Sequence, residues 1–208
     1  ETPLPGDGAG VAEIVERRND FQAMFGLLQR VIRLDPENAP SHVKLGKLYL
    51  IGGDEAQALE SADTALALDP DNADALALKG AVLVKLDDEA GGVEFAQRAI
   101  DIDPANSEAA AVIATALFRR GDSEAAIAEI ERALGENNEA PILHLMRLQL
   151  LSNLDRDDEL DAGFEDLISL YPDTASYRQM YVALLTQKGR HDEAKAQLEE
   201  IVKLRPGE

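Results

Sequence analysis

The stretch from Ala65 to Asn72, ALALDPDN, is nearly repeated as AIDIDPAN at residues 99–106, 34 residues further along the chain. Other prolines keep the same spacing, with gaps of 34 or twice 34 between Pro36, Pro70, Pro104, Pro172 and Pro206, and Asn138 fills the missing place. Proline has no N–H group to donate and disfavours helical geometry in the residue before it, so each proline ends a helix. These endings divide the chain into repeats of 34 residues.

Each repeat also contains signals for the start of a new helix. An asparagine side chain can accept a hydrogen bond from the first free N–H groups of a helix. Three asparagines that follow the prolines are predicted N-caps of this kind: Asn38, Asn72 and Asn106. At mid-repeat, a turn at positive φ followed by a second N-cap is predicted by Gly53 with Asp54 and by Gly121 with Asp122. The corresponding turn of repeat six has Gly189 but no aspartate after it. A repeat is therefore predicted to hold two helices and two turns.

Apolar residues in repeat two recur three and four positions apart, as they do along one face of a helix. In the first half the pattern includes Leu45 and Leu48, and in the second half Ala58, Ala62 and Ala65. A single helix cannot bury such a face, whereas stacking one repeat on the next buries it continuously. Self-similarity at this period predicts an all-α solenoid.

Repeat two carries a set of residues whose spacing resembles the tetratricopeptide (TPR) consensus: Leu45, Gly46, Tyr49, Ala58, Ala65 and Pro70. The other repeats match it less completely, since repeat five has Leu148 and Leu160 where small residues are expected, and repeat one has Met24 at such a place. The resemblance implies a right-handed α-solenoid of stacked antiparallel helix pairs, a TPR superhelix of about 12 helices.

The repeat boundaries predict the domain organisation. We expect a flexible leader at residues 1–8, a TPR solenoid at 9–206 and a tail at 207–208. The six expected repeats cover residues 9–38, 39–72, 73–106, 107–140, 141–174 and 175–206. Both ends of the chain fall within the repeat pattern, so we expect the array to be a piece of a longer one. Where the native chain does stop after Pro206, the alternative is self-association through the C-terminal helix.

Composition excludes several classes of function. The chain has 20 Lys and Arg against 40 Asp and Glu, a net charge of −20, and this field repels nucleic acid and anionic membrane surfaces. Cysteine is absent, so no disulfide or thiolate chemistry is available. No apolar run approaches the ~20 residues needed to span a bilayer. We expect neither a catalytic residue, nor a cofactor, nor a metal.

Three features that could suggest chemistry have simpler explanations. His42 and His144 hold the same position three repeats apart and cannot meet at one ion, so we expect a structural role for them and for His191. The acidic run at residues 155–161 lacks the glycine and terminal glutamate of a calcium loop; we expect it, and the similar run at 87–89, to cap a second helix. The glycines at residues 6–10 lack the Lys-Ser/Thr of a phosphate-binding loop.

The family resemblance implies that the first helix of each repeat lines a concave groove where ligands bind. The groove residues expected from the repeat spacing are Val43, Lys44, Lys47, Leu78, Ala81, Lys85, Val112, Thr115, Arg119, Met146, Gln149 and Met180, and Leu145 lies on the same face. The groove positions hold two acids, Asp74 and Glu108, and more bases than that: Lys44, Lys47, Lys85 and Arg119. In the whole chain, by contrast, acids outnumber bases. Either this face is an exposed binding surface, or its apolar side chains pack between neighbouring helices and its bases are solvated.

This groove predicts a protein or peptide partner, namely an extended or amphipathic helical segment with apolar anchors and some acidic groups. It does not fit the carboxylate clamp of chaperone-binding TPR domains, because the five matching positions are Val43, Lys47, Leu78, Glu108 and Val112 and supply one base. We therefore expect a non-catalytic interaction scaffold. The alternative is a structural module that associates with itself or with other domains of a longer chain. The Asp-Pro-x-Asn repeats also resemble bacterial TPR proteins of the cell envelope, which favours the periplasm or envelope over the cytoplasm.

Overall fold

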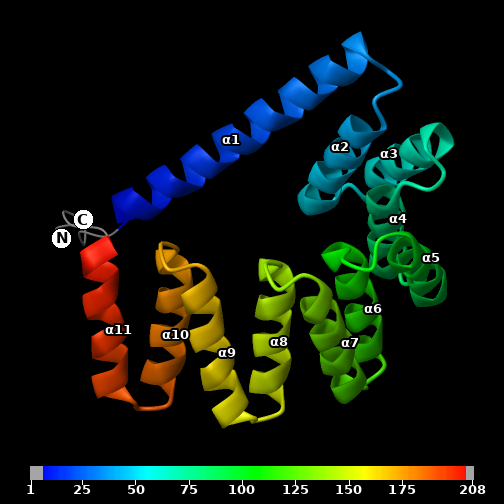
Figure 1. The fold of residues 1–208 in the computed structure, drawn as a ribbon. Helices are drawn as coiled ribbons and strands as arrows, with labels where there is room; N and C mark the ends of the chain where they lie inside the picture. The colour runs from blue at the N-terminus through cyan, green and yellow to red at the C-terminus, as the bar shows by residue number, and fades with distance from the viewer. Residues whose placement is uncertain (1–6, 205–208) are drawn as a thin grey trace. The chain divides into compact units, whose positions relative to one another are not determined.

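The computed structural model describes residues 7–204, with side chains from Asp20 onward. This described part is all helical, as expected, and contains eleven helices (Figure 1). Their bounds are α1 Asp7–Leu34, α2 Ala39–Gly52, α3 Glu55–Leu68, α4 Ala73–Lys85, α5 Glu89–Ile102, α6 Ser107–Arg119, α7 Ser123–Glu136, α8 Pro141–Asn153, α9 Asp157–Leu170, α10 Ala175–Gln187 and α11 His191–Leu204.

The helices form two compact parts, which are described separately. The N-terminal part comprises residues 1–120 and the C-terminal part residues 121–208. In the N-terminal part, α2 pairs with α3 and α4 with α5, while α6 packs against α4 and α5. In the C-terminal part, α8 pairs with α9 and α10 with α11, and α7 packs against α8. The boundary falls inside the fourth expected repeat, between α6 and α7.

The predicted helix starts are confirmed by hydrogen bonds. The Oδ1 atoms of Asn38, Asn72 and Asn106 accept from the backbone N–H three residues later at 3.0, 3.0 and 2.9 Å. At mid-repeat, Gly53 and Gly121 have φ of 78° and 84°, and the aspartate after each caps the next helix. Asp87 adopts the same geometry without being a glycine, at φ 64°. These local bonds fix the helix boundaries before any contact between repeats is considered.

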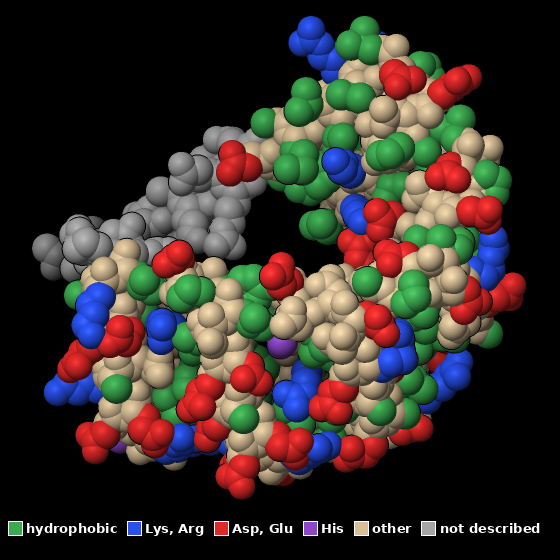
Figure 2. All heavy atoms as spheres, in the orientation of Figure 1, with side chains coloured by type: hydrophobic (Ala, Val, Ile, Leu, Met, Phe, Trp, Pro, Cys, Tyr) green, Lys and Arg blue, Asp and Glu red, His purple; other side chains and the backbone are tan. Residues whose placement is uncertain are grey.

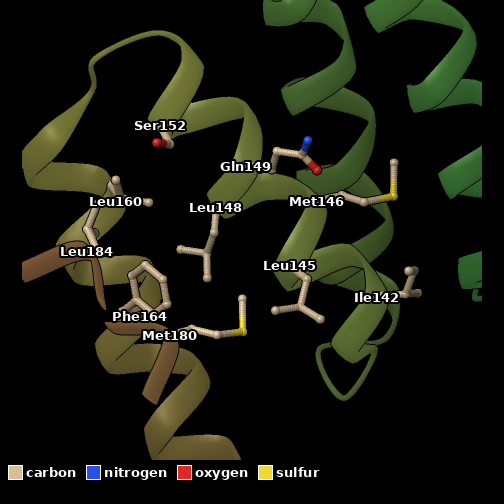
Figure 3. Close-up of a pocket in the computed structure, with 10 residues that line it drawn as sticks. All are labelled: Ile142, Leu145, Met146, Leu148, Gln149, Ser152, Leu160, Phe164, Met180 and Leu184. Atoms are coloured by element: carbon tan, nitrogen blue, oxygen red, sulfur yellow. The ribbon is translucent and has the colours of Figure 1, made fainter. Parts of the chain in front are cut away.

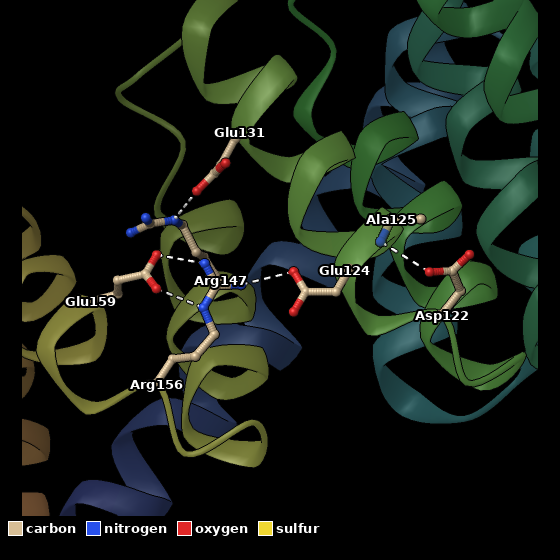
Figure 4. A network of polar contacts seen from close by, with 7 residues as sticks. All are labelled: Asp122, Glu124, Ala125, Glu131, Arg147, Arg156 and Glu159. Carbon is tan, nitrogen blue, oxygen red and sulfur yellow. Dashed lines mark hydrogen bonds and ion pairs between the residues drawn. The ribbon is translucent and has the colours of Figure 1, made fainter.

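Repeat five begins its second helix differently from what the acidic run suggested. The N-cap of α9 is Arg156, which makes no side-chain cap bond, and the acids occupy the first turn, where they suit the helix dipole. Arg156 instead holds Glu159 with two hydrogen bonds of 2.6 Å and Glu124 of α7 with one of 2.9 Å (Figure 4). The bonds to Arg156 lower the pKa of Glu159. A second bridge, Arg147 to Glu131 at 3.0 Å, also joins α8 to α7.

Repeat one departs most from the expected pattern. A helix pair was expected between residues 9 and 35, but the structure has the single 28-residue helix α1 there. This difference accounts for eleven helices in the described residues rather than about 12. Residues 1–6 of the expected leader and the expected tail lie outside the described residues, and α1 already includes Asp7 and Gly8.

Close approach of paired helices depends on small side chains. A Cβ built on Gly92 of α5 would lie 2.8 Å from the carbonyl oxygen of Gly80 on α4 and 2.5 Å from a methyl of Val84. At the equivalent sequence positions in α3 and α7, Ala58 and Ala126 are fully buried. Because backbone lies on both sides of the contact, no side-chain rearrangement can make room for a larger residue.

We therefore expect Gly92→Ala to destabilise the protein. Overpacking costs roughly 1–3 kcal/mol, which exceeds the roughly 0.5–1 kcal/mol that alanine typically gains over glycine inside a helix. Gly26→Ala in α1 is the matched control, because a Cβ there meets no atom within 4 Å and only the helix gain remains. Urea denaturation of the two variants measures both effects, and equal stabilisation by both would contradict the close contact.

Candidate functional site

The twelve expected groove residues divide between the two parts of the chain. Nine lie on α2, α4 and α6 of the N-terminal part, and Met146, Gln149 and Met180 lie on α8 and α10 of the C-terminal part. In the N-terminal part, Val43, Leu78 and Val112 are buried, with exposed fractions of 3, 2 and 6%. Val43 and Leu78 belong to the core formed with Ala58 and neighbouring residues. These three apolar side chains pack between helices, which leaves mainly polar residues facing outward.

Three of the four bases expected on the N-terminal face lie beside acids. The Nζ atom of Lys47 lies 2.6 Å from Glu108, which joins α2 to α6, and that of Lys85 lies 3.9 Å from Glu55. Arg119 donates to the carbonyl oxygen of Val84 at 2.7 Å and to Asp87 at 3.2 Å. These bases are therefore already engaged within the chain. On the face shown in Figure 2, acidic and basic side chains lie intermingled over both parts.

The C-terminal part holds an apolar pocket between α8, α9 and α10, with a volume of about 410 Å³. It brings together the three remaining expected groove residues. Leu145, Leu148, Phe164 and Met180 point toward the same space (Figure 3). Its lining consists of Ile142, Leu145, Met146, Leu148, Gln149, Ser152, Leu160, Phe164, Met180 and Leu184. None of these side chains carries a charge, although 29% of the residues in the chain are charged.

The pocket follows from two large residues at positions that are small elsewhere. Leu148 stands where repeats two and three have Gly46 and Gly80, and Leu160 where they have Ala58 and Gly92. Both leucines are buried, at 4 and 1% exposure, and they prevent α8 and α9 from approaching as α4 and α5 do. Gly163 provides the space for Leu148, since a Cβ there would lie 2.7 Å from a methyl of that leucine. Helices α8 and α9 are therefore held apart, and the pocket lies on the face that carries the expected groove residues.

One wall of the pocket is fixed from behind by a polar network. The rings of Phe164 and Tyr181 stack at 4.8 Å between centroids, with 14° between their planes. The Tyr181 hydroxyl donates to Asp161 at 3.1 Å, and Arg190 donates to the other oxygen of the same carboxylate at 2.5 Å. Burial, the negative charge of Asp161 and this hydrogen bond raise the pKa of Tyr181 to about 12. The network holds Phe164 in place beside the cavity.

Sequence reasoning missed six of the ten lining residues: Ile142, Leu148, Ser152, Leu160, Phe164 and Leu184. A signal was present, because Leu148 and Leu160 depart from the small-residue pattern in the same repeat. Two such departures on facing helices indicate that the pair is separated, and the neighbouring apolar residues then line the gap.

Two of the three histidines, His42 and His144, make equivalent contacts with the backbone. The Nε2 atom of His42 lies 2.9 Å from the carbonyl oxygen of Pro36, and that of His144 lies 2.8 Å from the equivalent oxygen of Asn138. In the described residues, no group of three or more histidine and acidic side chains is arranged to hold a metal ion. Within the same residues, no helix is both long and apolar enough to cross a bilayer.

Comparisons with known proteins agree with the repeat analysis. Tetratricopeptide repeat families match residues 43–107 and residues 175–208. The chain therefore contains tetratricopeptide repeats. TPR proteins generally act as non-catalytic scaffolds that bind proteins or peptides. No curated protein matches the sequence.

Several solved structures share the fold. TTC0263, a TPR protein of Thermus thermophilus, has a TM-score of 0.62 and 24% identity over 82% of this chain and 93% of its own. Pseudomonas aeruginosa pilF has a TM-score of 0.61 and 18% identity over 96 and 90% of the two chains. MamA protein has a TM-score of 0.56 and 20% identity over 82 and 93%. At these identities the likeness is one of fold.

The raised pKa of Tyr181 gives a testable pH dependence. Between pH 10 and about 12 the unfolded chain loses this proton while the folded chain keeps it, so the free energy of unfolding falls as pH rises through this range. We expect Tyr181→Phe to remove the highest-pH step of the tyrosinate absorbance titration. This step should be about a quarter of the amplitude, since the chain has four tyrosines. An unchanged step in the variant would contradict the assignment.

Proposed function

We propose that this protein is a non-catalytic interaction scaffold whose C-terminal part binds an apolar side chain of a partner. The apolar pocket between α8, α9 and α10 is the observation that supports it. Met180 is 45% exposed and Ile142 is 48% exposed beside buried Leu148, so the wall is accessible as well as apolar. Methionine side chains adapt to varied shapes, which suits a pocket that receives an anchor residue. The occupant fitting this lining is a bulky apolar side chain on an extended or amphipathic helical segment.

The N-terminal part contributes polar contacts in this proposal. Lys47 and Glu108 are partly solvated, at 30 and 46% exposure, and such a pair contributes only about 0–1 kcal/mol. An acidic group of a partner can therefore replace Glu108 beside Lys47 at little cost. The resemblance to envelope TPR proteins makes a bacterial envelope assembly the setting that we propose for this scaffold.

A second candidate function is self-association through the C-terminal helix α11. Leu198 and Val202 of this helix are 47 and 67% exposed and lie four residues apart, on one face. This apolar face supports a structural role in which the chain contacts a second copy. Its position outside the pocket allows the two functions to be tested separately.

The test compares two variants of similar exposure. Peptides selected against the wild-type protein from a random library should bind Met180→Glu more weakly, because a charge replaces an apolar contact at the pocket. Burying a whole methionine side chain contributes roughly 1.5–3 kcal/mol, and Met180 is 45% exposed. Loss of about half of that contribution corresponds to about a threefold to tenfold rise in Kd. Fluorescence polarisation measures the change with labelled peptides.

Leu198→Glu is the control, since Leu198 is exposed to the same degree but lies outside the pocket lining. We expect it to leave peptide affinity unchanged. Peptide binding that survives Met180→Glu would contradict the pocket as the binding site. A fall in molar mass caused by Leu198→Glu, measured by light scattering, would instead support self-association through α11.

A further inference from the structure

Repeat one contains a turn-like sequence at which the chain stays helical instead of turning. Asn19 and Asp20 stand 34 residues before Gly53 and Asp54, at the position where the later repeats turn. In the turns of repeats two to four the first residue has positive φ and the second caps the next helix, as Asp87 and Asp88 show without glycine. Asparagine adopts positive φ more readily than most residues, and aspartate is a favoured N-cap. Helix α1 nevertheless runs through both residues from Asp7 to Leu34 (Figure 1).

The second half of α1 takes the place of a second helix of a repeat. Leu28 is buried against Leu45 and Leu48 of α2, and the rings of Phe25 and Tyr49 meet edge to face at 5.2 Å. This is the contact that each second helix makes with the following repeat. The other contact of a second helix, with the first helix of its own repeat, has no counterpart along the described side chains of α1.

Exposed apolar residues mark that missing contact. Met24 and Leu27 are 54 and 61% exposed, whereas the equivalent residues of repeat two, Ala58 and Ser61, are 0 and 7% exposed. Val31 continues the stripe at helical spacing and is partly exposed. In repeat two this face is covered by α2, where a Cβ on Gly46 would lie 3.0 Å from that of Ser61. The stripe of Met24, Leu27 and Val31 therefore lies where the first helix of repeat one would pack, and that helix is missing from this face.

We propose that residues 9–18 of a second copy cover this stripe, so that two chains exchange the first helix of repeat one. The sequence of this segment, AGVAEIVERR, places Val11, Ile14 and Val15 at helical spacing, and Ala12 stands where repeat two has Gly46. In a continuous helix, Ala12 and Leu27 are about 22 Å apart, at 1.5 Å per residue, so a straight α1 cannot cover its own stripe. Exchange of an identical element between two copies is a low-cost route to a dimer.

Paired cysteines test the exchange, since the chain has none of its own. In the exchanged dimer, Ala12→Cys and Leu27→Cys lie opposite one another across the two chains, as Gly46 and Ser61 do within repeat two. A disulfide needs Cβ atoms about 3.5–4.5 Å apart, so helices spaced slightly wider than that 3.0 Å contact allow it. Under mild oxidation we expect a covalent dimer on a non-reducing gel. A cross-linked monomer would show that the chain turns at Asn19 and covers its own stripe. Either that result or the absence of a cross-link overturns the proposal.

Two further variants make the result specific. Ala12→Cys with Gln29→Cys should not cross-link, because Gln29 lies on the opposite, exposed side of α1. Leu27→Glu places a charge in the stripe, so sedimentation equilibrium should show a dimer for wild type and a monomer for this variant, with helical content by circular dichroism retained. A wild-type monomer, or a Leu27→Glu dimer, overturns the proposal. Met180→Glu should leave the dimer intact, which keeps this test independent of peptide binding.

Discussion

Contact between paired helices through small residues is the constraint on which each repeat depends. Between α4 and α5 the backbones of Gly80 and Gly92 approach so closely that neither site has room for a methyl group. Alanines occupy the corresponding buried sites in α3 and α7. Such contacts are formed by backbone and short side chains, so they fix the distance between helices with little freedom to adjust. The position of every other side chain on the pair follows from that distance.

The two candidate interaction surfaces arise where this constraint is not met. In repeat five, Leu148 and Leu160 replace both small residues, the helices separate, and an apolar pocket opens beside Phe164 and Met180. In repeat one, Met24 replaces the small residue on the second helix. The segment expected to form the first helix is instead the first half of the single helix α1. A large residue at the pairing site thus leads either to a separated pair or to an uncovered face. Both outcomes leave apolar surface for a partner.

Sequence could predict the features that depend on local interactions. The caps at Asn38, Asn72 and Asn106 need only a side chain and an N–H group three residues away, and the repeat spacing locates them. The large residues Leu148 and Leu160 could indicate that α8 and α9 are separated. The full lining of the pocket could not be predicted, because it depends on how side chains from α8, α9 and α10 fill the space between them. Nor could spacing show that Val43 and Leu78 are buried, since neighbouring helices decide which groove positions remain exposed. The continuity of α1 was missed because the 34-residue spacing predicts a turn near Asn19 and Asp20, and these residues are also compatible with a helix.

Charge determines which contacts can drive association with a partner. The bases Lys47, Lys85 and Arg119 each lie beside an acid of the same chain, so they form no isolated positive patch. The net charge of −20 therefore dominates the field that an approaching molecule meets. An acidic partner is repelled at long range, and this repulsion is screened beyond about 8 Å at physiological salt. Favourable free energy must then come from burying apolar surface, which salt does not weaken. The uncharged pocket of the C-terminal part has such surface.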